Sequence, residues 1–233
     1  MSKGVCIVTG VGPGTGAALV RRFAEGGFKV AMLARSADRL TELAAQTPNA
    51  RPYPCDVADE AQLKTTLARI ADDLGPASVL IHNAVGGAFG DFMQIDPAVL
   101  ERNFKTNVMA LFHLARAVAP AMIDAGQGAI IATGNTSAYR GKANFAGFAP
   151  TKAAQRILAE SLARSLGPKG IHVAYLAIDA VIDVPWTRKQ YADKPDDYFA
   201  KPAAIANVAW DIAHQDRSTW AFDTVVRPFG ENW

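Results

Sequence analysis

Apolar segments of strand length alternate with amphipathic helical segments along most of the chain. Stretches such as 5–9 and 171–178 are apolar almost throughout, which is typical of strands buried on both faces of a parallel sheet. Between such stretches apolar residues recur at helical spacing, as in 17–26. The alternation predicts an α/β fold, in which a doubly wound parallel sheet is covered by helices on both faces to give three layers.

The same pattern gives the bounds of the expected elements. Strands are expected at 5–9, 29–34, 52–55, 78–83, 128–133, 171–178 and 219–226. Helices are expected at 17–26, 36–46, 59–74, 97–125, 150–166 and 203–213. No repeat, low-complexity tract or linker interrupts the 233 residues, so residues 1–233 are predicted to form a single domain.

Composition narrows the class of protein. The net charge is only +2 and no run of Lys or Arg is long enough to follow a phosphate backbone, so nucleic acid is not an expected partner. Cys6 and Cys55 form no CxxC or Cys/His cluster, and the four histidines share no ligand spacing, so neither a disulfide nor a metal is expected. We expect a cytoplasmic protein with no signal peptide and no stretch approaching a membrane span.

A glycine-rich loop lies directly between the first strand and the first helix. It reads Thr9-Gly10-Val11-Gly12-Pro13-Gly14-Thr15-Gly16. Glycines allow a sharp turn and a close approach of the backbone to a pyrophosphate, and the N-terminus of the following helix favours anions. The alternative is a tight strand–helix turn without a ligand, and the correct placement of the loop makes that interpretation the weaker one.

Four further motifs follow in a fixed order. They are Asp56-Val57 after the third strand, His82-Asn83-Ala84-Val85 after the fourth, Asn107 in the long helix, and Lys152. With the glycine loop, this series resembles the short-chain dehydrogenase/reductase family, most strongly between residues 9 and 152. The resemblance implies a Rossmann-type fold with a dinucleotide site. The cofactor-binding residues it implies are Gly10, Gly14, Thr15, Gly16, Arg35, Ser36, Asp56, Val57, Asn83, Ala84, Lys152 and Ile182.

The end of the second strand bears on which dinucleotide binds. An NAD(H) site needs an acidic residue there to bind the ribose 2′-hydroxyl, whereas this sequence has Ala34, Arg35 and Ser36. A guanidinium binds a phosphate with two hydrogen bonds. We therefore expect NADP(H) in preference to NAD(H). In the alternative interpretation, Arg35 is only a solvated charge at the start of a helix.

The active site departs from the family pattern. The family carries a serine and a tyrosine at set distances before the active-site lysine, and at those positions this chain has Asn135 and Phe148. A phenyl ring carries no ionisable group, so the proton transfer that the family assigns to tyrosine has no donor here. The expected catalytic residues are therefore Asn107, Asn135 and Lys152, with Asn135 stabilising an oxyanion rather than moving a proton.

Two aromatic residues are assigned to the substrate pocket, Phe148 and Tyr139. The phenol of Tyr139 is a candidate for a relocated proton donor, and the alternative is an aromatic residue at the rim or in an interface. The stretch 183–201 is polar, aromatic and proline-bearing, and lies where the family has its substrate-covering segment. We expect it to be a loop that covers the substrate.

Three functions remain open. The first is an NADP(H)-dependent oxidoreductase that acts on a small carbonyl or alcohol, or on an activated alkene. The second is a catalytically weak or inactive NADP(H)-binding sensor. The third uses the scaffold without a nucleotide, and the complete glycine loop argues against it. The sequence resembles a divergent branch of the family that has the same Phe, which favours the first function by descent. Because the helices at 97–125 and 150–166 pair across a two-fold axis in this family, a homodimer or homotetramer is expected.

Overall fold

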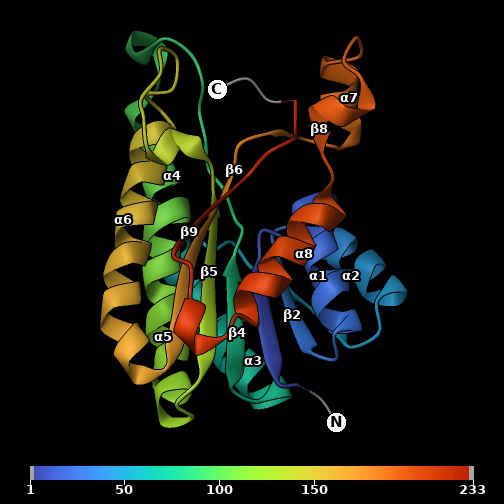
Figure 1. Cartoon of the computed structure of the whole chain (residues 1–233), viewed down its shortest axis with the longest axis vertical. Helices are drawn as coiled ribbons and strands as arrows, with labels where there is room; N and C mark the ends of the chain where they lie inside the picture. The colour runs from blue at the N-terminus through green and yellow to red at the C-terminus, as the bar shows by residue number, and fades with distance from the viewer. Residues whose placement is uncertain (1–2, 231–233) are drawn as a thin grey trace.

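A seven-stranded parallel sheet forms the centre of the molecule (Figure 1), in the order β3-β2-β1-β4-β5-β6-β9. The computed structural model describes residues 3–230. The strands of this sheet are β1 (Val5–Thr9), β2 (Lys29–Ala34), β3 (Ala50–Pro54), β4 (Ala77–His82), β5 (Gly128–Gly134), β6 (Ile171–Ile178) and β9 (Asp223–Val226). The predicted α/β doubly wound sheet is confirmed, and its strand order reverses between β1 and β4.

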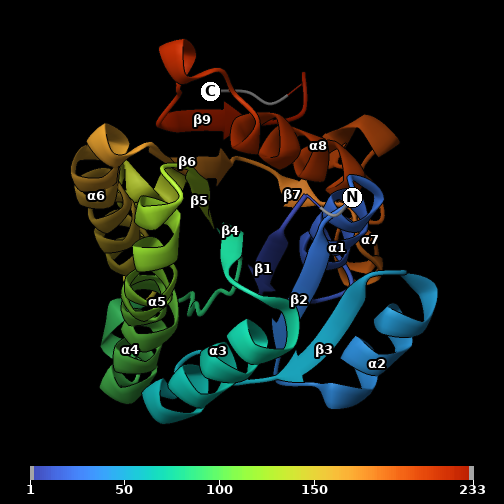
Figure 2. The same ribbon diagram turned by 90° about the horizontal axis from the view of Figure 1, so that it is seen from below.

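Helices cover both faces of the sheet (Figure 2). The α-helices are α1 (Thr15–Glu25), α2 (Ala37–Gln46), α3 (Glu60–Leu74), α4 (Pro97–Phe104), α5 (Ala110–Asp124), α6 (Ala149–Leu166), α7 (Pro185–Gln190) and α8 (Pro202–Ala213). One apolar core lies between the sheet and α3, α5 and α6, and the other between the sheet and α1, α2 and α8. Every residue of β1 and of β6 is buried, as expected of strands between two helical layers.

Local sequence explains where several helices begin. Ser36 and Asp59 are the N-caps of α2 and α3, and each side chain accepts a hydrogen bond from a backbone N–H of the first turn. Such caps typically stabilise a helix by about 1 kcal/mol. Both helices were expected to include the capping residue, so the predicted and observed starts differ by one position for this reason.

The long helix expected at 97–125 contains an irregularity. Between α4 and α5 a π-helical turn, η2 (Lys105–Met109), includes Asn107. Pro120 lies inside α5 without ending it. A π-turn inserts one extra residue and re-aims the side chains that follow, and such turns are frequent at functional sites.

The expectation that no stretch approaches a membrane span was wrong. By length and composition, Pro97–Asp124 is long and apolar enough to cross a membrane, with a mean hydropathy of 1.3 in its most apolar window. Five of the apolar side chains of α5 lie in the core against the sheet, namely Leu111, Leu114, Ala115, Val118 and Met122. Packing against the sheet therefore accounts for these five apolar positions, and 39% of the most apolar window is buried.

Two expectations near the C-terminus need correction. The stretch 183–201 contains the helix α7, a 3₁₀ turn at Asp196–Tyr198, and β8 (Phe199–Ala200), which pairs with β7 (Val181–Ile182). The last strand is shorter than expected because Arg217–Thr219 forms a 3₁₀ turn instead.

Candidate functional site

The site residues gather at the carboxyl ends of β1, β4, β5 and β6. These ends flank the point where the strand order reverses, which is where open α/β sheets bind ligands. The loop after β1 approaches the end of β4 there, and the polar side chains after β5 and on the first turns of α6 complete the site.

The glycine loop is packed too closely for side chains at two positions. Gly10 has a φ of +69°, and a Cβ there would lie 2.5 Å from the backbone of Ala84. A Cβ on Gly16 would lie 2.5 Å from the carbonyl oxygen of Gly10. Gly14 faces the later part of the chain instead, because a Cβ there would meet Val184 at 2.8 Å. The loop therefore depends on glycine at positions 10 and 16.

Two features of this loop fit a phosphate group. The first turn of α1 leaves backbone N–H groups without partners inside the helix, and its positive end favours an anion. The hydroxyl of Thr15, in that same turn, is buried without a hydrogen-bond partner among the described residues. An unpaired buried hydroxyl is costly, and a phosphate oxygen at this place would satisfy it.

Arg35 follows β2 and is exposed. Within residues 3–230 its guanidinium makes no hydrogen bond or ion pair. Ser36 beside it has its hydroxyl oxygen engaged, since that oxygen accepts the Arg39 backbone N–H at 3.4 Å. An unpaired guanidinium at the end of β2 fits a ribose 2′-phosphate, while Ser36 serves first as a helix cap.

Asp56 lies after β3 with its carboxylate already bound. It accepts the Ala58 N–H at 3.0 Å and the Arg102 guanidinium at 2.6 Å. Partial burial opposes ionisation of this carboxyl, but these two partners outweigh burial and hold its pKa below the usual value. Val57 is buried in the core. Arg102 therefore shares the carboxylate that the family resemblance assigns to the cofactor.

Asn83 connects three elements at the centre of the site. Its amide donates to the Gly10 carbonyl at 3.0 Å and accepts from the Thr133 hydroxyl at 3.1 Å. The next residue, Ala84, is buried and donates its N–H to the Thr9 hydroxyl. These contacts hold the end of β4 against the glycine loop, so both residues act through the backbone geometry that they fix.

His82, at the end of β4, is fully buried and its protonation is set by its neighbours. Nε2 lies 3.1 Å from the Thr106 carbonyl, which can only accept, so Nε2 carries the proton. Nδ1 therefore accepts the Thr9 hydroxyl at 3.0 Å. Burial and the nearby charge of Lys152 lower the pKa of His82 to about 3, so the ring is neutral at physiological pH.

Asn107 uses its whole amide group within the protein. Its oxygen accepts the Gly86 N–H at 2.9 Å, and its nitrogen donates to the Gly86 carbonyl at 2.8 Å and the Thr151 hydroxyl at 2.7 Å. Both N–H groups of the Asn107 amide are therefore hydrogen-bonded to protein oxygens. In this structure Asn107 positions the segment after β4 against α6.

Lys152 projects from the first turns of α6 and is 3% exposed. Its ammonium donates to the Thr133 carbonyl at 3.2 Å and to Gln155 Oε1 at 2.8 Å. Burial lowers the pKa of Lys152 to about 7, because the charged form loses hydration and gains only neutral partners. The group can therefore exist both protonated and neutral near physiological pH.

The ring of Phe148 lies close to Lys152, with its centroid 5.9 Å from Nζ. It is 5% exposed and offers no proton. Asn135, after β5, accepts the Ser137 N–H on its amide oxygen at 3.1 Å. No hydrogen bond from its amide nitrogen is found within residues 3–230, which leaves two donors for an oxyanion.

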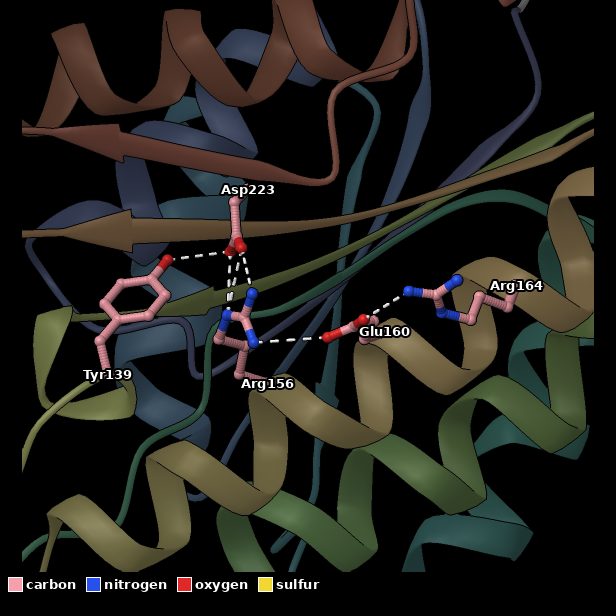
Figure 3. Close-up of polar contacts among 5 residues, drawn as sticks. All are labelled: Tyr139, Arg156, Glu160, Arg164 and Asp223. Atoms are coloured by element: carbon pink, nitrogen blue, oxygen red, sulfur yellow. Dashed lines mark hydrogen bonds and ion pairs between the residues drawn. The ribbon is translucent and has the colours of Figure 1, made fainter.

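Tyr139 lies in a surface network with Asp223 and Arg156 (Figure 3). Its hydroxyl donates to Asp223 on β9 at 2.9 Å, and Arg156 lies over its ring. Burial and the Asp223 carboxylate raise the pKa of Tyr139 to about 12. Arg156 also pairs with Asp223 and with Glu160. In this conformation the phenol is bound to a carboxylate, so the structure does not support it as the relocated proton donor.

The segment 183–201 begins beside the glycine loop. Val184, and Ile182 just before the segment, approach Gly14. Its fold is fixed by Arg188, which bonds Asp183 at 2.6 and 2.8 Å and Asp196 at 2.6 Å. An ordered segment at this place is consistent with the proposed cover.

Sequence reasoning missed four residues that shape the site. Gln155 lies three positions after Lys152 on the same helix face, and this spacing is a signal that could have identified it. Arg102, Thr133 and Phe89 contact the site through the fold alone, from positions far along the chain. No local pattern distinguishes them.

Comparisons with known proteins agree with this geometry. A model of the short chain dehydrogenase family matches residues 4–194. The 7alpha-hydroxysteroid dehydrogenase of Escherichia coli (strain K12) is 30% identical over 215 residues, which cover 87% of this chain and 84% of that protein. The chain belongs to the short-chain dehydrogenase family. It is an oxidoreductase of that type by family.

Solved structures share the whole fold. A metagenomic short-chain oxidoreductase in complex with NADP is 26% identical, with a TM-score of 0.84 and 99% of each chain covered. An NAD⁺-bound xylitol dehydrogenase is 24% identical, with a TM-score of 0.88 over 97% of this chain and 98% of its own. The first neighbour supports a nicotinamide cofactor, and the second shows the fold.

Proposed function

We propose that this protein is an NADP(H)-dependent oxidoreductase that reduces a small carbonyl compound or an activated alkene. The observation that carries the cofactor preference is the unpaired guanidinium of Arg35 at the end of β2, where an acidic residue would select NAD(H). The glycine loop and the unpaired hydroxyl of Thr15 support a bound pyrophosphate.

Different residues bind different parts of NADP(H). The N–H groups of Gly14, Thr15 and Gly16 bind the pyrophosphate, since those of Val11 and Gly12 already donate to protein carbonyls. Arg35 binds the 2′-phosphate, and Lys152 binds the nicotinamide ribose. When bound, NADPH supplies a hydride to the substrate. Ile182 and the segment that follows it exclude water from the reacting atoms.

The charge that develops on the substrate oxygen needs stabilisation. The amide nitrogen of Asn135 is available as a donor, and a positioned donor of this kind is worth about 10²–10³ in rate. The proton for the product comes from water, since Phe148 has none to give and the Tyr139 hydroxyl is bound to Asp223. Turnover is expected to be slow for the family, because a positioned acid contributes about 10²–10⁴ in rate.

A specific observation favours a second candidate, an NADP(H)-binding sensor with negligible turnover. The polar groups around the reaction centre are largely satisfied by the protein itself, as the contacts of Asn107 show. In this case binding of NADP(H) sets a conformation or a partner, and no substrate increases the oxidation of NADPH.

The outer faces of α5 and α6 support a proposal for assembly. Met109 and Ile157 are exposed apolar side chains on or beside these helices, which suits an interface between two copies. We propose a homodimer or homotetramer formed through this face. A monomer at micromolar concentration in light scattering would contradict it.

Calorimetric titration with NADPH and NADH tests the cofactor proposal. NADPH is expected to bind more tightly than NADH, and Arg35→Ala to weaken NADPH about 10–100-fold, the value of charge-assisted hydrogen bonds, while leaving NADH unchanged. Arg39→Ala, which removes an exposed arginine one turn further along, is the matched control and should change neither. Failure of both cofactors to bind would overturn the proposal.

A further inference from the structure

Three phenylalanine rings pack together where the family carries its catalytic tyrosine. The ring centroid of Phe89 lies 5.0 Å from that of Phe148 and 5.1 Å from that of Phe145, in tilted and edge-to-face arrangements. These separations and angles are the favourable ones for aromatic pairs. We refer to Phe89, Phe145 and Phe148 as the aromatic wall.

The wall is fixed by the two chain segments that carry it. A Cβ on Gly87 would lie 2.9 Å from the ring of Phe148, so the segment after β4 lies directly against that ring. The Gly90 N–H donates to the Asn144 carbonyl at 2.9 Å, and Asn103 donates to the Gly147 carbonyl at 2.8 Å. The wall is therefore held together before any ligand binds.

The outer part of the wall is apolar and exposed. Phe89 is 63% exposed, and three more apolar residues of the same segment are exposed by more than half, namely Val85, Phe92 and Met93. Clustered apolar exposure of this kind marks a binding surface more often than isolated exposed side chains do. The segment therefore presents apolar surface that a ligand would cover.

The wall lies next to the residues of the candidate site. Its inner ring, Phe148, lies 5.9 Å from Lys152 Nζ. Val85 directly follows Ala84, whose backbone packs on Gly10 of the glycine loop. The apolar surface thus begins beside the residues that hold the cofactor and extends outward from them.

Resting on the oxidoreductase function proposed above, we propose that the aromatic wall selects a ring-bearing, apolar carbonyl compound or conjugated enone and rejects polyhydroxylated substrates. A substrate ring gains area burial and ring–ring contact on Phe89. A hydroxyl placed on the same surface loses its hydrogen bonds to water and finds no partner on a phenyl ring.

Reduction of an enone needs only NADPH as the hydride donor and water as the proton donor. For an enone, the carbon–carbon double bond is reduced: one carbon gains the hydride and its neighbour gains a proton from water, with NADPH oxidised to NADP⁺. The intermediate charge lies on the carbonyl oxygen, which Asn135 can stabilise. No proton donor is needed at the position of Phe148.

Binding without turnover provides the test. Benzylideneacetone and dihydroxyacetone are titrated calorimetrically into protein saturated with NADP⁺, which cannot donate a hydride. Benzylideneacetone is expected to bind at least about 10-fold more tightly than dihydroxyacetone, and Phe89→Ala to weaken it by about 10-fold, the value of burying a ring. The control is Val225→Ala, an exposed apolar truncation on the edge strand β9, which should leave binding unchanged.

Each outcome decides the proposal. Equal binding of the two probes, or unchanged binding in Phe89→Ala and in Phe89→Leu, would overturn it. A change in oligomeric state in Phe89→Ala, without a change in binding, would identify the wall as a subunit contact instead. Tight binding of benzylideneacetone without oxidation of NADPH would support the wall and overturn the proposed turnover. Reduction of dihydroxyacetone but not of benzylideneacetone would support the proposed turnover and overturn the role proposed for the aromatic wall.

Discussion

The site has a nucleotide end, formed by the glycine loop and Arg35, and a reaction end, formed by Asn107, Asn135 and Phe148. The polar groups of the two ends differ in how far the protein itself pairs them. At the nucleotide end, the Thr15 hydroxyl is buried without a partner and the Arg35 guanidinium is free of ion pairs among the described residues. At the reaction end, the amide of Asn107 is fully engaged, and the Tyr139 hydroxyl is kept outside this end by its bond to Asp223. The first end is prepared for a ligand, while the second is largely satisfied by the protein itself.

This difference separates two properties that usually occur together in the family. Binding of a dinucleotide needs free donors and a glycine loop, and both are present. Proton transfer needs a titratable group next to the substrate, and the position holds the ring of Phe148 instead. Lys152 remains between the two ends, buried and bonded only to neutral acceptors, so its charge is available to a ligand rather than to a protein carboxylate.

The largest effect is expected from Gly16→Ala. The new Cβ would lie 2.5 Å from the Gly10 carbonyl oxygen. Because that oxygen belongs to the backbone and cannot rotate away, the loop must shift. NADPH affinity should fall at least about 10³-fold, or ~4 kcal/mol, by calorimetric titration. Gly12→Ala is the matched control, because a Cβ there has nothing within 4 Å. Wild-type affinity for NADPH in Gly16→Ala would show that the loop does not bind the cofactor.

Lys152→Met tests the cost of the buried charge. The lowered pKa of about 7, against 10.5 in the unfolded chain, means that the unfolded state binds more protons between these values, so stability rises with pH there. The loss of stability caused by the buried charge of Lys152 is therefore greatest below pH 7 and disappears by pH 10.5. Lys152→Met should therefore raise the free energy of unfolding, on the order of 2–4 kcal/mol below pH 7.

Chemical denaturation at several pH values measures this effect. The gain from Lys152→Met should shrink steadily between pH 7 and pH 10.5. Lys169→Met removes an exposed lysine near the end of the same helix and should show no such trend. A gain independent of pH would mean that packing, rather than the buried charge, limits stability.

Phe148→Tyr restores a hydroxyl at the reaction end. Because Lys152 lies next to the ring, its charge favours the ionised phenol and so prepares it for proton transfer. Reduction of simple aromatic aldehydes, whose carbonyl oxygen must be protonated, should speed up by about 10–10²-fold, measured as oxidation of NADPH. Phe112→Tyr adds the same hydroxyl on α5 and should have no effect. Slower reduction by Phe148→Tyr would show that packing of the substrate on the aromatic wall contributes more to the rate than a proton donor at position 148.

The sequence predicted the elements whose signal is local. β1 and β6 were placed to the residue because their apolar runs are continuous and bounded by glycine or polar residues. The helix α7 was missed because six residues carry little periodicity and it is held by Arg188 bonded to Asp183 and Asp196. Such a network depends on the folded positions of its members and leaves no pattern in the sequence.

The candidate site divides in the same way. The glycine loop, Arg35 and Lys152 follow from residue type and spacing. The partner of Tyr139, by contrast, lies 84 residues away on β9, and the ring that covers Phe148 comes from the segment after β4. Tertiary contacts of this kind decide whether a polar group is free or bound, and therefore decide which candidate can act.

The smallest effect is expected from Tyr139→Phe. The variant removes one hydrogen bond to Asp223, which Arg156 still binds, so the free energy of unfolding should fall by about 1 kcal/mol. Oxidation of NADPH with an aromatic carbonyl should stay within about twofold of the wild type, whereas loss of a catalytic acid costs at least about 10²-fold. Asp223→Asn should lower stability by more, because it also weakens the ion pair with Arg156. A large loss of turnover in Tyr139→Phe, but not in Asp223→Asn, would show that the phenol acts at the reaction end. The reaction end would then have a proton donor, and the difference between the two ends would no longer hold.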